Sequence, residues 1–287
     1  MRWLARLAAV LALGVAQVTV ACDDRDSDSS TGRSQTAGAA TIWAVGDGAD
    51  GSPAARRVAR LIAHERPTRF IYLGDVYPLG RAEDFRGGYD PVYGRLRGRT
   101  LPTPGNHEWA NHAQGYDRYW RRVAGRRAPH FYSVRLAAAG WTLISLNSEA
   151  SLEPGSPQLR WLRRGVSGGG NCRIGFWHRP RFSAGPHGDQ PDVAPLWRIL
   201  RGRSKLILNG HDHNMQELVP ARGTRTLVAG AGGHGLYPLD RRHPRLAWGS
   251  ARTPGALRLR LTPGVARYAF VSDDGRVLRR GLIRCRQ

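Results

Sequence analysis

Lysine is almost absent from this 287-residue sequence, although the chain is strongly basic. Lys205 is the single lysine among 44 Lys and Arg residues, which outnumber 22 Asp and Glu residues and give a formal net charge of +22. The arginines are spread along the chain, and their longest uninterrupted runs are pairs such as Arg121-Arg122. Nucleic-acid-binding proteins more often gather basic residues on one helix or tail, with stacking aromatic residues between them. A nucleic-acid partner is therefore not expected.

The net charge of the chain has two compatible interpretations. It fits a generally basic surface, and it fits an electrostatic field that attracts anionic substrates or holds the protein near an anionic envelope.

No apolar stretch is long enough for a comfortable membrane span, which argues against a multi-span membrane protein. Residues 7–21 form an uncharged stretch of 15 residues after Arg2 and Arg6, as in a secretory signal peptide. We therefore expect a signal peptide at 1–21, a flexible linker rich in Asp, Ser, Gly and Thr at 22–40, and a folded domain at 41–287. The end of the signal resembles a bacterial lipobox, which predicts a lipid anchor on Cys22 and a location in the cell envelope. Simple cleavage near Ala21, which would give a secreted protein, is the alternative.

Cysteine is scarce as well, with three residues in the chain. If Cys22 carries a lipid, Cys172 and Cys285 remain as an even pair in an oxidising compartment. A disulfide between them would pin the C-terminal end of the chain. Two unpaired thiols are the alternative, because the sequence does not show whether the two Cα atoms come close enough.

From residue 41 onward, short apolar runs alternate with amphipathic segments, and a composition of 41% hydrophobic and 23% charged residues argues against wholesale disorder. Each apolar run ends in Gly, Asn or His, as expected of strands buried on both faces. These predicted strands are 41–46, 69–74, 141–147, 173–178 and 205–210. The segments between them predict helices at 53–66, 115–124, 156–165 and 192–202.

The last part of the chain has a different pattern. Three further strands are predicted at 256–261, 265–271 and 277–283, separated by turns at Pro263-Gly264 and Asp274-Gly275. The whole pattern predicts a single α/β domain with two sheets and helices outside them.

Residue types that bind metals recur directly after the predicted strands or in tight turns. They are Asp47 (GDG), Asp75 (GDVY), Asn106 and His107 (PGNHE), His178 (FWH), and His211 and His213 (NGHDH). Open α/β sheets place their sites at the carboxyl ends of strands, so we expect these side chains to lie together. Any one of these motifs alone would be a weak signal.

These motifs resemble those of the calcineurin-like metallophosphoesterase superfamily, and within it the purple acid phosphatase branch, over about residues 42–235. The resemblance implies a four-layer α/β/β/α sandwich that binds two metal ions, Fe together with Zn, Mn or Fe. It implies a first metal held by Asp47, Asp75 and His213, and a second metal held by Asp75, Asn106, His178 and His211. A bridging carboxylate can hold two cations roughly 3.5–4 Å apart, so that one activates hydroxide and both stabilise phosphoryl oxygens.

The same resemblance implies roles for two further histidines. His107 would contact the substrate phosphate and help to stabilise or protonate the leaving oxygen. His187, nine residues after His178, would assist the leaving group. An exposed loop residue is the alternative for His187.

Two departures from the family pattern concern the first metal. Ala49 stands where the common first motif of the superfamily has histidine, a loss typical of the purple branch, which uses a tyrosinate ligand instead. Tyr77 lies two residues after Asp75 rather than three, and a slip of one residue in a strand turns a side chain to the other face, although a loop can compensate. Tyr77 is therefore either a metal ligand or a packed aromatic residue. In the second case Mn, Zn or Fe(II) become the expected metals.

Several neighbouring residues are expected to have supporting roles. His112 and His234 could edge the site, and Glu108 and Asp212 are expected to orient adjacent ligands. Asp50 is expected to be a solvated turn residue, with a supporting contact to the site as the alternative.

The expected reaction is hydrolysis of a small anionic phosphate monoester by metal-bound hydroxide. No nucleophilic serine or cysteine motif competes for this role, so a phosphoenzyme is not expected. Phosphodiester or nucleotide hydrolysis on the same metals is one alternative. A non-catalytic binder of anionic polymers is the other, and the intact ligand set argues against it.

Overall fold

The structure is a computed structural model that describes residues 38–125 and 129–286. The chain divides into two units, Met1–Gln35 and Thr36–Gln287. The predicted signal peptide, the lipid anchor on Cys22 and nearly all of the predicted linker lie outside the described residues. The first strand, β1, begins at Ala40, one residue before the expected start of the domain. None of the helices in the described ranges has the length and apolar character needed to cross a membrane.

The first sheet has six strands in the order β13-β12-β11-β1-β2-β3. Its members are β1 (Ala40–Val45), β2 (Arg69–Tyr72), β3 (Thr100–Pro102), β11 (Gly255–Thr262), β12 (Val265–Ser272) and β13 (Val277–Arg284). β1, β2 and β3 run parallel, whereas β11, β12 and β13 pair antiparallel, as the turns at Gly264 and Gly275 predict.

The second sheet has seven strands in the order β10-β8-β9-β7-β6-β5-β4. They are β4 (Tyr132–Leu136), β5 (Trp141–Ser145), β6 (Arg173–Phe176), β7 (Leu206–Asn209), β8 (Met215–Leu218), β9 (Arg225–Ala229) and β10 (Leu246–Ser250). β5, β6, β7 and β9 are parallel, and the remaining strands are antiparallel to their neighbours.

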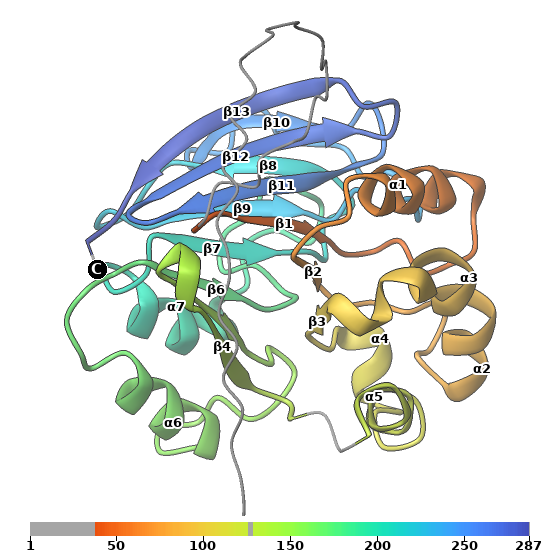
Figure 1. The fold of residues 1–287 in the computed structure, drawn as a ribbon, viewed down its shortest axis with the longest axis horizontal. Helices are drawn as coiled ribbons and strands as arrows, with labels where there is room; N and C mark the ends of the chain where they lie inside the picture. The colour runs from red at the N-terminus through yellow and green to blue at the C-terminus, as the bar shows by residue number, and fades with distance from the viewer. Residues whose placement is uncertain (1–37, 126–128, 287) are drawn as a thin grey trace, which may run out of the picture. The chain divides into compact units, whose positions relative to one another are not determined.

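Helices lie on the outer faces of both sheets (Figure 1). They are α1 (Pro53–His64), α2 (Ala82–Asp84), α3 (Asp90–Tyr93), α4 (Asn106–Trp109), α5 (Tyr116–Ala124), α6 (Pro157–Gly165) and α7 (Ala194–Leu200). α1 begins as predicted, because Ser52 accepts a hydrogen bond from the amide of Ala55 and Pro53 occupies the first turn.

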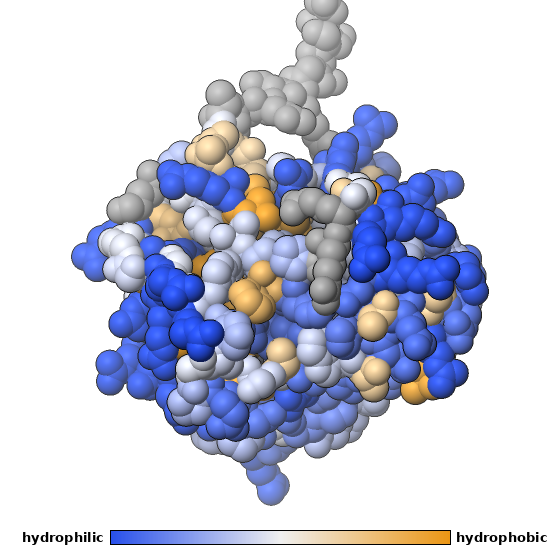
Figure 2. All heavy atoms as spheres, turned by 90° about the horizontal axis from the view of Figure 1, so that it is seen from below, coloured by the Kyte–Doolittle hydropathy of each residue, from blue (hydrophilic) through white to orange (hydrophobic). Residues whose placement is uncertain are grey.

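Three apolar clusters define the layers. One lies between the sheets and joins residues such as Ile42 and Leu257 of the first sheet to Phe176 and Leu208 of the second. Another packs α1, α3 and α5 on the outer face of the first sheet, and a third packs α6 and α7 on the outer face of the second. The structure therefore has the predicted four-layer α/β/β/α arrangement. The face in Figure 2 is mostly hydrophilic, with scattered apolar patches.

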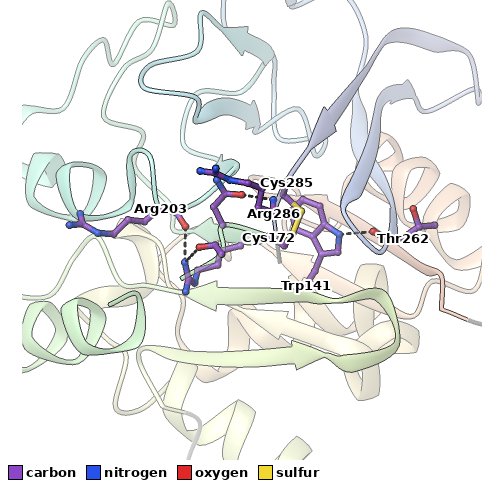
Figure 3. The surroundings of a disulfide bond; sticks show 9 residues. Trp141, Cys172, Arg203, Thr262, Cys285 and Arg286 are labelled. Carbon is purple, nitrogen blue, oxygen red and sulfur yellow. Dashed lines mark hydrogen bonds between the residues drawn. A yellow bond between two sulfur atoms is a disulfide. The ribbon is translucent and has the colours of Figure 1, made fainter. Parts of the chain in front are cut away.

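Cys172 and Cys285 form a disulfide, with their Cα atoms 5.1 Å apart (Figure 3). Cys172 directly precedes β6 and Cys285 directly follows β13, so the bond joins the two sheets. Asn171 and Arg286 exchange two hydrogen bonds beside it. Of the two alternatives that the sequence leaves open, the structure shows the disulfide.

Candidate metal centre

Loops at the carboxyl ends of four parallel strands, together with the start of α4, bring the predicted ligands into one buried region. The ligands after β1, β2, β6 and β7 are Asp47, then Asp75 and Tyr77, then His178, then His211 and His213. Asn106 is the first residue of α4. Asp47, Asp75, His178, His211 and His213 are all buried. Residues far apart in the sequence therefore meet at one end of the two sheets, as predicted.

One group of ligand atoms surrounds Nε2 of His178. This nitrogen lies 3.0 Å from Oδ1 of Asn106, 3.2 Å from Nδ1 of His211 and 3.3 Å from Oδ2 of Asp75. Nδ1 of His178 lies 2.8 Å from the carbonyl oxygen of Leu73. A carbonyl only accepts, so Nδ1 carries the proton in the neutral ring and Nε2 is left as a ligand atom. Spacings of this size suit atoms that each lie about 2.0–2.2 Å from one cation.

The electrostatics of this group favour a positive charge. Burial alone would raise the pKa of Asp75, but attraction from His178 and hydrogen bonds from His178 and His107 outweigh it and lower the pKa. Burial disfavours the charged form of His178, yet Asp75 and Asp47 raise its pKa to about 10. Burial and the charge of His178 lower the pKa of His211 to about 2. A bound cation would supply the charge that the His178 proton otherwise provides, so metal and proton compete for this imidazole.

A second group of ligand atoms surrounds the phenol oxygen of Tyr77. This oxygen lies 2.9 Å from Nε2 of His213 and 3.4 Å from both Oδ1 of Asp47 and Oδ2 of Asp75. Tyr77 thus reaches the predicted cluster despite its shorter spacing from Asp75, because both residues lie in a loop rather than within β2. Burial and the charge of Asp75 raise the pKa of Asp47, and burial and both carboxylates raise that of Tyr77. Two buried carboxylates beside a phenol repel one another when ionised, and a bound cation would stabilise their charged forms.

The carboxylate of Glu108 supports the backbone of Asp75. Its Oε2 accepts hydrogen bonds from the amides of Asp75 and Gly105, at 3.0 and 3.1 Å. Burial and the nearby charge of Asp75 raise the pKa of Glu108 to about 8. The amide of His107 donates to Oδ1 of Asp75, at 3.1 Å. Glu108 therefore supports Asp75, which lies 33 residues away, rather than the side chain of Asn106 beside it in the sequence.

His107 and His187 lie beside different groups of ligands: His107 is near Asp75 and His187 is near His211. Nδ1 of His107 lies 2.6 Å from the carbonyl oxygen of Pro78, and its Nε2 lies 3.7 Å from Oδ2 of Asp75. Nδ1 of His187 lies 3.0 Å from Oδ1 of Asp212, and its ring centre is 4.0 Å from that of His211. Both side chains are about a third exposed, at 35% and 38%. Asp212 therefore contacts His187 rather than orienting the ligands beside it in the sequence.

Other residues that the sequence singles out have mixed outcomes. His234 stacks on Tyr77 and bonds to Asp50, which is thus in contact with the site through His234. His112 does not edge the site but pairs with Asp117. Tyr237, which stacks on His213, is missed by the sequence reasoning. The Gly-rich residues 230–235 (GAGGHG) just before it indicate a loop at this point of the chain.

Comparison with known proteins gives a match to a family model. Residues 40–215 match the model described as calcineurin-like phosphoesterase. No curated protein sequence matches the chain.

Several solved structures share the fold. GAP50, described as the anchor in the inner membrane complex of Plasmodium, has a TM-score of 0.69 at 16% identity, over 87% of this chain and 90% of its own. Purple acid phosphatase PPD1 from yellow lupin (Lupinus luteus) has the same TM-score at 13% identity, over 86% of this chain and 54% of its own. A dimetal phosphatase from Danio rerio has a TM-score of 0.55 at 13% identity, over 85% of this chain and 98% of its own.

Proposed function

The chain belongs to the calcineurin-like phosphoesterase family, and from this membership we propose that it hydrolyses phosphate monoesters at a dinuclear metal centre. The observation that carries the proposal is the pair of ligand groups that share Asp75. The first group is Asp47, Asp75, Tyr77 and His213, and the second is Asp75, Asn106, His178 and His211. Two bound ions, with Fe, Zn or Mn suited to these ligands, would activate water and neutralise phosphoryl charge.

The two flanking histidines supply protons at defined atoms. His107 donates from Nδ1 to the carbonyl of Pro78, and His187 donates from Nδ1 to the carboxylate of Asp212. In both rings Nε2 is therefore the atom that can hold or release a proton toward the substrate. Because the two rings lie beside different ligand groups, one can bind the phosphoryl oxygens while the other protonates the leaving oxygen.

The donor pattern favours a monoester over a diester. A monoester has three terminal phosphoryl oxygens, whereas a diester has two and carries a second organic group. Two partly exposed imidazoles next to a dinuclear centre supply more hydrogen-bond and metal partners than the two terminal oxygens of a diester need.

A comparison of two chromogenic substrates tests the function. We expect metal-loaded protein to hydrolyse p-nitrophenyl phosphate faster than bis-p-nitrophenyl phosphate. Asp75→Asn and Asn106→Ala should lower the metal content and reduce kcat/KM by about 10²–10³ or more, because the first removes the shared carboxylate and the second removes a ligand. His64→Ala, on an exposed part of α1, is the control and should match the wild type.

Other outcomes would change the proposal. Faster turnover of the diester would identify a phosphodiesterase on the same centre. Binding of polyphosphate that survives Asp75→Asn, without hydrolysis of either ester, would indicate a non-catalytic binder of anionic polymers.

The leaving group separates the roles of the two histidines. Replacement of the residue that protonates the leaving oxygen should cost about 10²–10⁴ in kcat for an alkyl phosphate and much less for p-nitrophenyl phosphate, whose leaving group needs no proton. We expect His187→Ala to show this contrast, and His107→Ala to reduce both rates alike. Equal losses for both substrates in both variants would rule out a general acid among them.

A further inference from the structure

The loop after β9, residues 230–238, is tied to the backbone of two candidate ligands. The amide of His234 donates to the carbonyl of Asp47, and the amide of Tyr237 donates to the carbonyl of His213, both at 3.0 Å. Close approach of this loop to β1 requires glycine, because a Cβ at Gly232 would overlap the carbonyl oxygen of Gly46. The loop is therefore fixed to the ligands by its backbone.

The loop places one aromatic ring against each of two ligands. The His234 ring lies over the ring of Tyr77, with centres 3.7 Å apart and planes 18° apart. The Tyr237 ring lies over the imidazole of His213, with centres 3.9 Å apart and planes 10° apart. The phenol oxygen of Tyr77 and Nε2 of His213 also contact each other, at 2.9 Å. Two stacked pairs thus flank this contact.

A hydrogen bond fixes the plane of the His234 ring. Nδ1 of His234 lies 2.9 Å from Oδ2 of Asp50, and Oδ1 of Asp50 accepts from the amide of Ser52 at 2.8 Å. Asp50 follows Asp47 by three residues in the same loop. The support for Tyr77 therefore runs from the loop that carries Asp47, through Asp50 and His234, to the face of the phenol.

We propose that His234 and Tyr237 are positioning residues that hold Tyr77 and His213 on the first metal. This inference rests on the proposed function, since it concerns the same dinuclear centre. The stacking holds Tyr77 in reach of the cluster even though it lies only two residues after Asp75. Neither ring stacks on His178 or His211, the imidazoles of the second group, so we expect the larger effect at the first site.

The proposal predicts selective loss of one metal. Apoprotein would be reconstituted with Fe(III) and Zn(II), and metal equivalents and the visible spectrum would be measured. In the wild type a tyrosinate–Fe(III) charge-transfer band that vanishes in Tyr77→Phe is expected. His234→Ala should weaken Fe(III) binding about 10–100-fold and diminish or shift the band, with Zn(II) binding unchanged, because it removes a support rather than a ligand.

Conservative variants separate positioning from folding. His234→Phe keeps the stacked face and should retain most of the band, whereas Asp50→Asn should give a smaller shift than His234→Ala. His243→Ala is the control and should leave both metals in place, because the His243 ring contacts Asp189 and the amide of Arg245. Near-ultraviolet circular dichroism on every variant identifies any that fail to fold.

Each outcome decides the inference. It is overturned if His234→Ala and Tyr237→Leu retain the wild-type band and Fe(III) affinity, or if both metals are lost together. It is also overturned if the wild type shows no tyrosinate band, even when the same protein hydrolyses esters with Zn or Mn. If the band behaves as expected but no ester is cleaved, the proposed function fails and the positioning role stands.

Discussion

Three of the candidate ligands have a backbone conformation that side chains other than glycine rarely adopt. Asp47, Asp75 and His211 have φ angles of 59°, 67° and 73°, and they are three of the five non-glycine residues with positive φ in the described ranges. Such a conformation costs roughly 1–2 kcal/mol per residue. The positive φ angle turns the chain within two or three residues of each strand end. The amide of His211 can then donate to Oδ2 of Asp47, at 2.9 Å. Backbone strain and ligand geometry are thus coupled.

Gly105 offers a test of how closely the ligands are packed. A Cβ at this position would overlap Oδ1 of Asp75 and lie 2.7 Å from its amide nitrogen. Gly105→Ala should therefore displace Asp75, reduce metal content and lower kcat/KM about 10²-fold, the usual cost of a misplacement near 1 Å. The measurement is p-nitrophenyl phosphate turnover with elemental analysis. Gly87→Ala, where a Cβ would meet nothing within 4 Å, is the matched control, and equal activity of the two variants would contradict the prediction.

At the scale of elements, the strongly periodic segments are predictable from the sequence. The predicted helix 53–66 is observed as Pro53–His64, and the predicted strand 265–271 as Val265–Ser272. Five strands were missed: β3, β4, β8, β9 and β10. β3 (TLP), β4 (YSVRL) and β8 (MQEL) lack a continuous apolar run. β8 (MQEL), for example, is fully buried, but Gln216 and Glu217 give it no apolar signal. Their side chains are paired within the fold, which only tertiary contacts reveal.

The candidate ligands could be predicted from the sequence, whereas the residues that support them could not. Asp and His after buried strands carry a recognisable spacing, so the sequence indicates that they meet. The stacking of Tyr237 on His213 depends on the path of a Gly-rich loop, which the sequence does not specify. The partner of Asp212 was likewise hidden, because His187 lies 25 residues away. Supporting contacts therefore need the structure.

The short helix α5 offers a test of stability and its pH dependence. Asp117 in its first turn is buried and lies 2.6 Å from Nε2 of His130 and 3.1 Å from Nδ1 of His112. Burial would raise the pKa of Asp117, but the hydrogen bonds from these imidazoles outweigh it and lower the pKa from 3.8. Asp117→Asn should cost about 1.5–3 kcal/mol of unfolding free energy at pH 7, the range for hydrogen bonds to charged groups.

The sign of the pH effect follows from the lowered pKa. A carboxyl group whose folded pKa lies below its unfolded value stabilises the fold above the unfolded value, and the contribution is lost as the pH falls through the folded value. The deficit of Asp117→Asn should therefore be present above about pH 4 and shrink below it. Urea unfolding of both proteins across this range measures the deficit. A deficit that grows on acidification would contradict the assignment, and Glu153→Gln, at an exposed loop position, is the control.

At the scale of the whole molecule, the candidate centre depends on the packing of two sheets. Loops of the first sheet supply Asp47, Asp75 and Tyr77, and loops of the second supply His178, His211 and His213. Neither sheet holds a complete ligand group, since Asp75 meets His178 in one group and His213 lies beside Tyr77 in the other. Any change that separates the sheets should therefore remove both metals together.

The disulfide provides the test at this scale, because it joins the sheets away from the ligands. Cys172 precedes β6 whereas His178 follows it, so the bond and the centre lie at opposite ends of this strand. The bond closes a loop with a sequence separation of 113 residues, for which its loss is expected to cost about 2–5 kcal/mol. The double variant Cys172→Ala/Cys285→Ala should thus show a lower Tm and unfolding free energy, but wild-type metal content and kcat at 25 °C. Dithiothreitol should lower the Tm of the wild type and leave that of the variant unchanged. Loss of metal from the folded variant at 25 °C would show instead that the bond holds the two sets of ligand loops together.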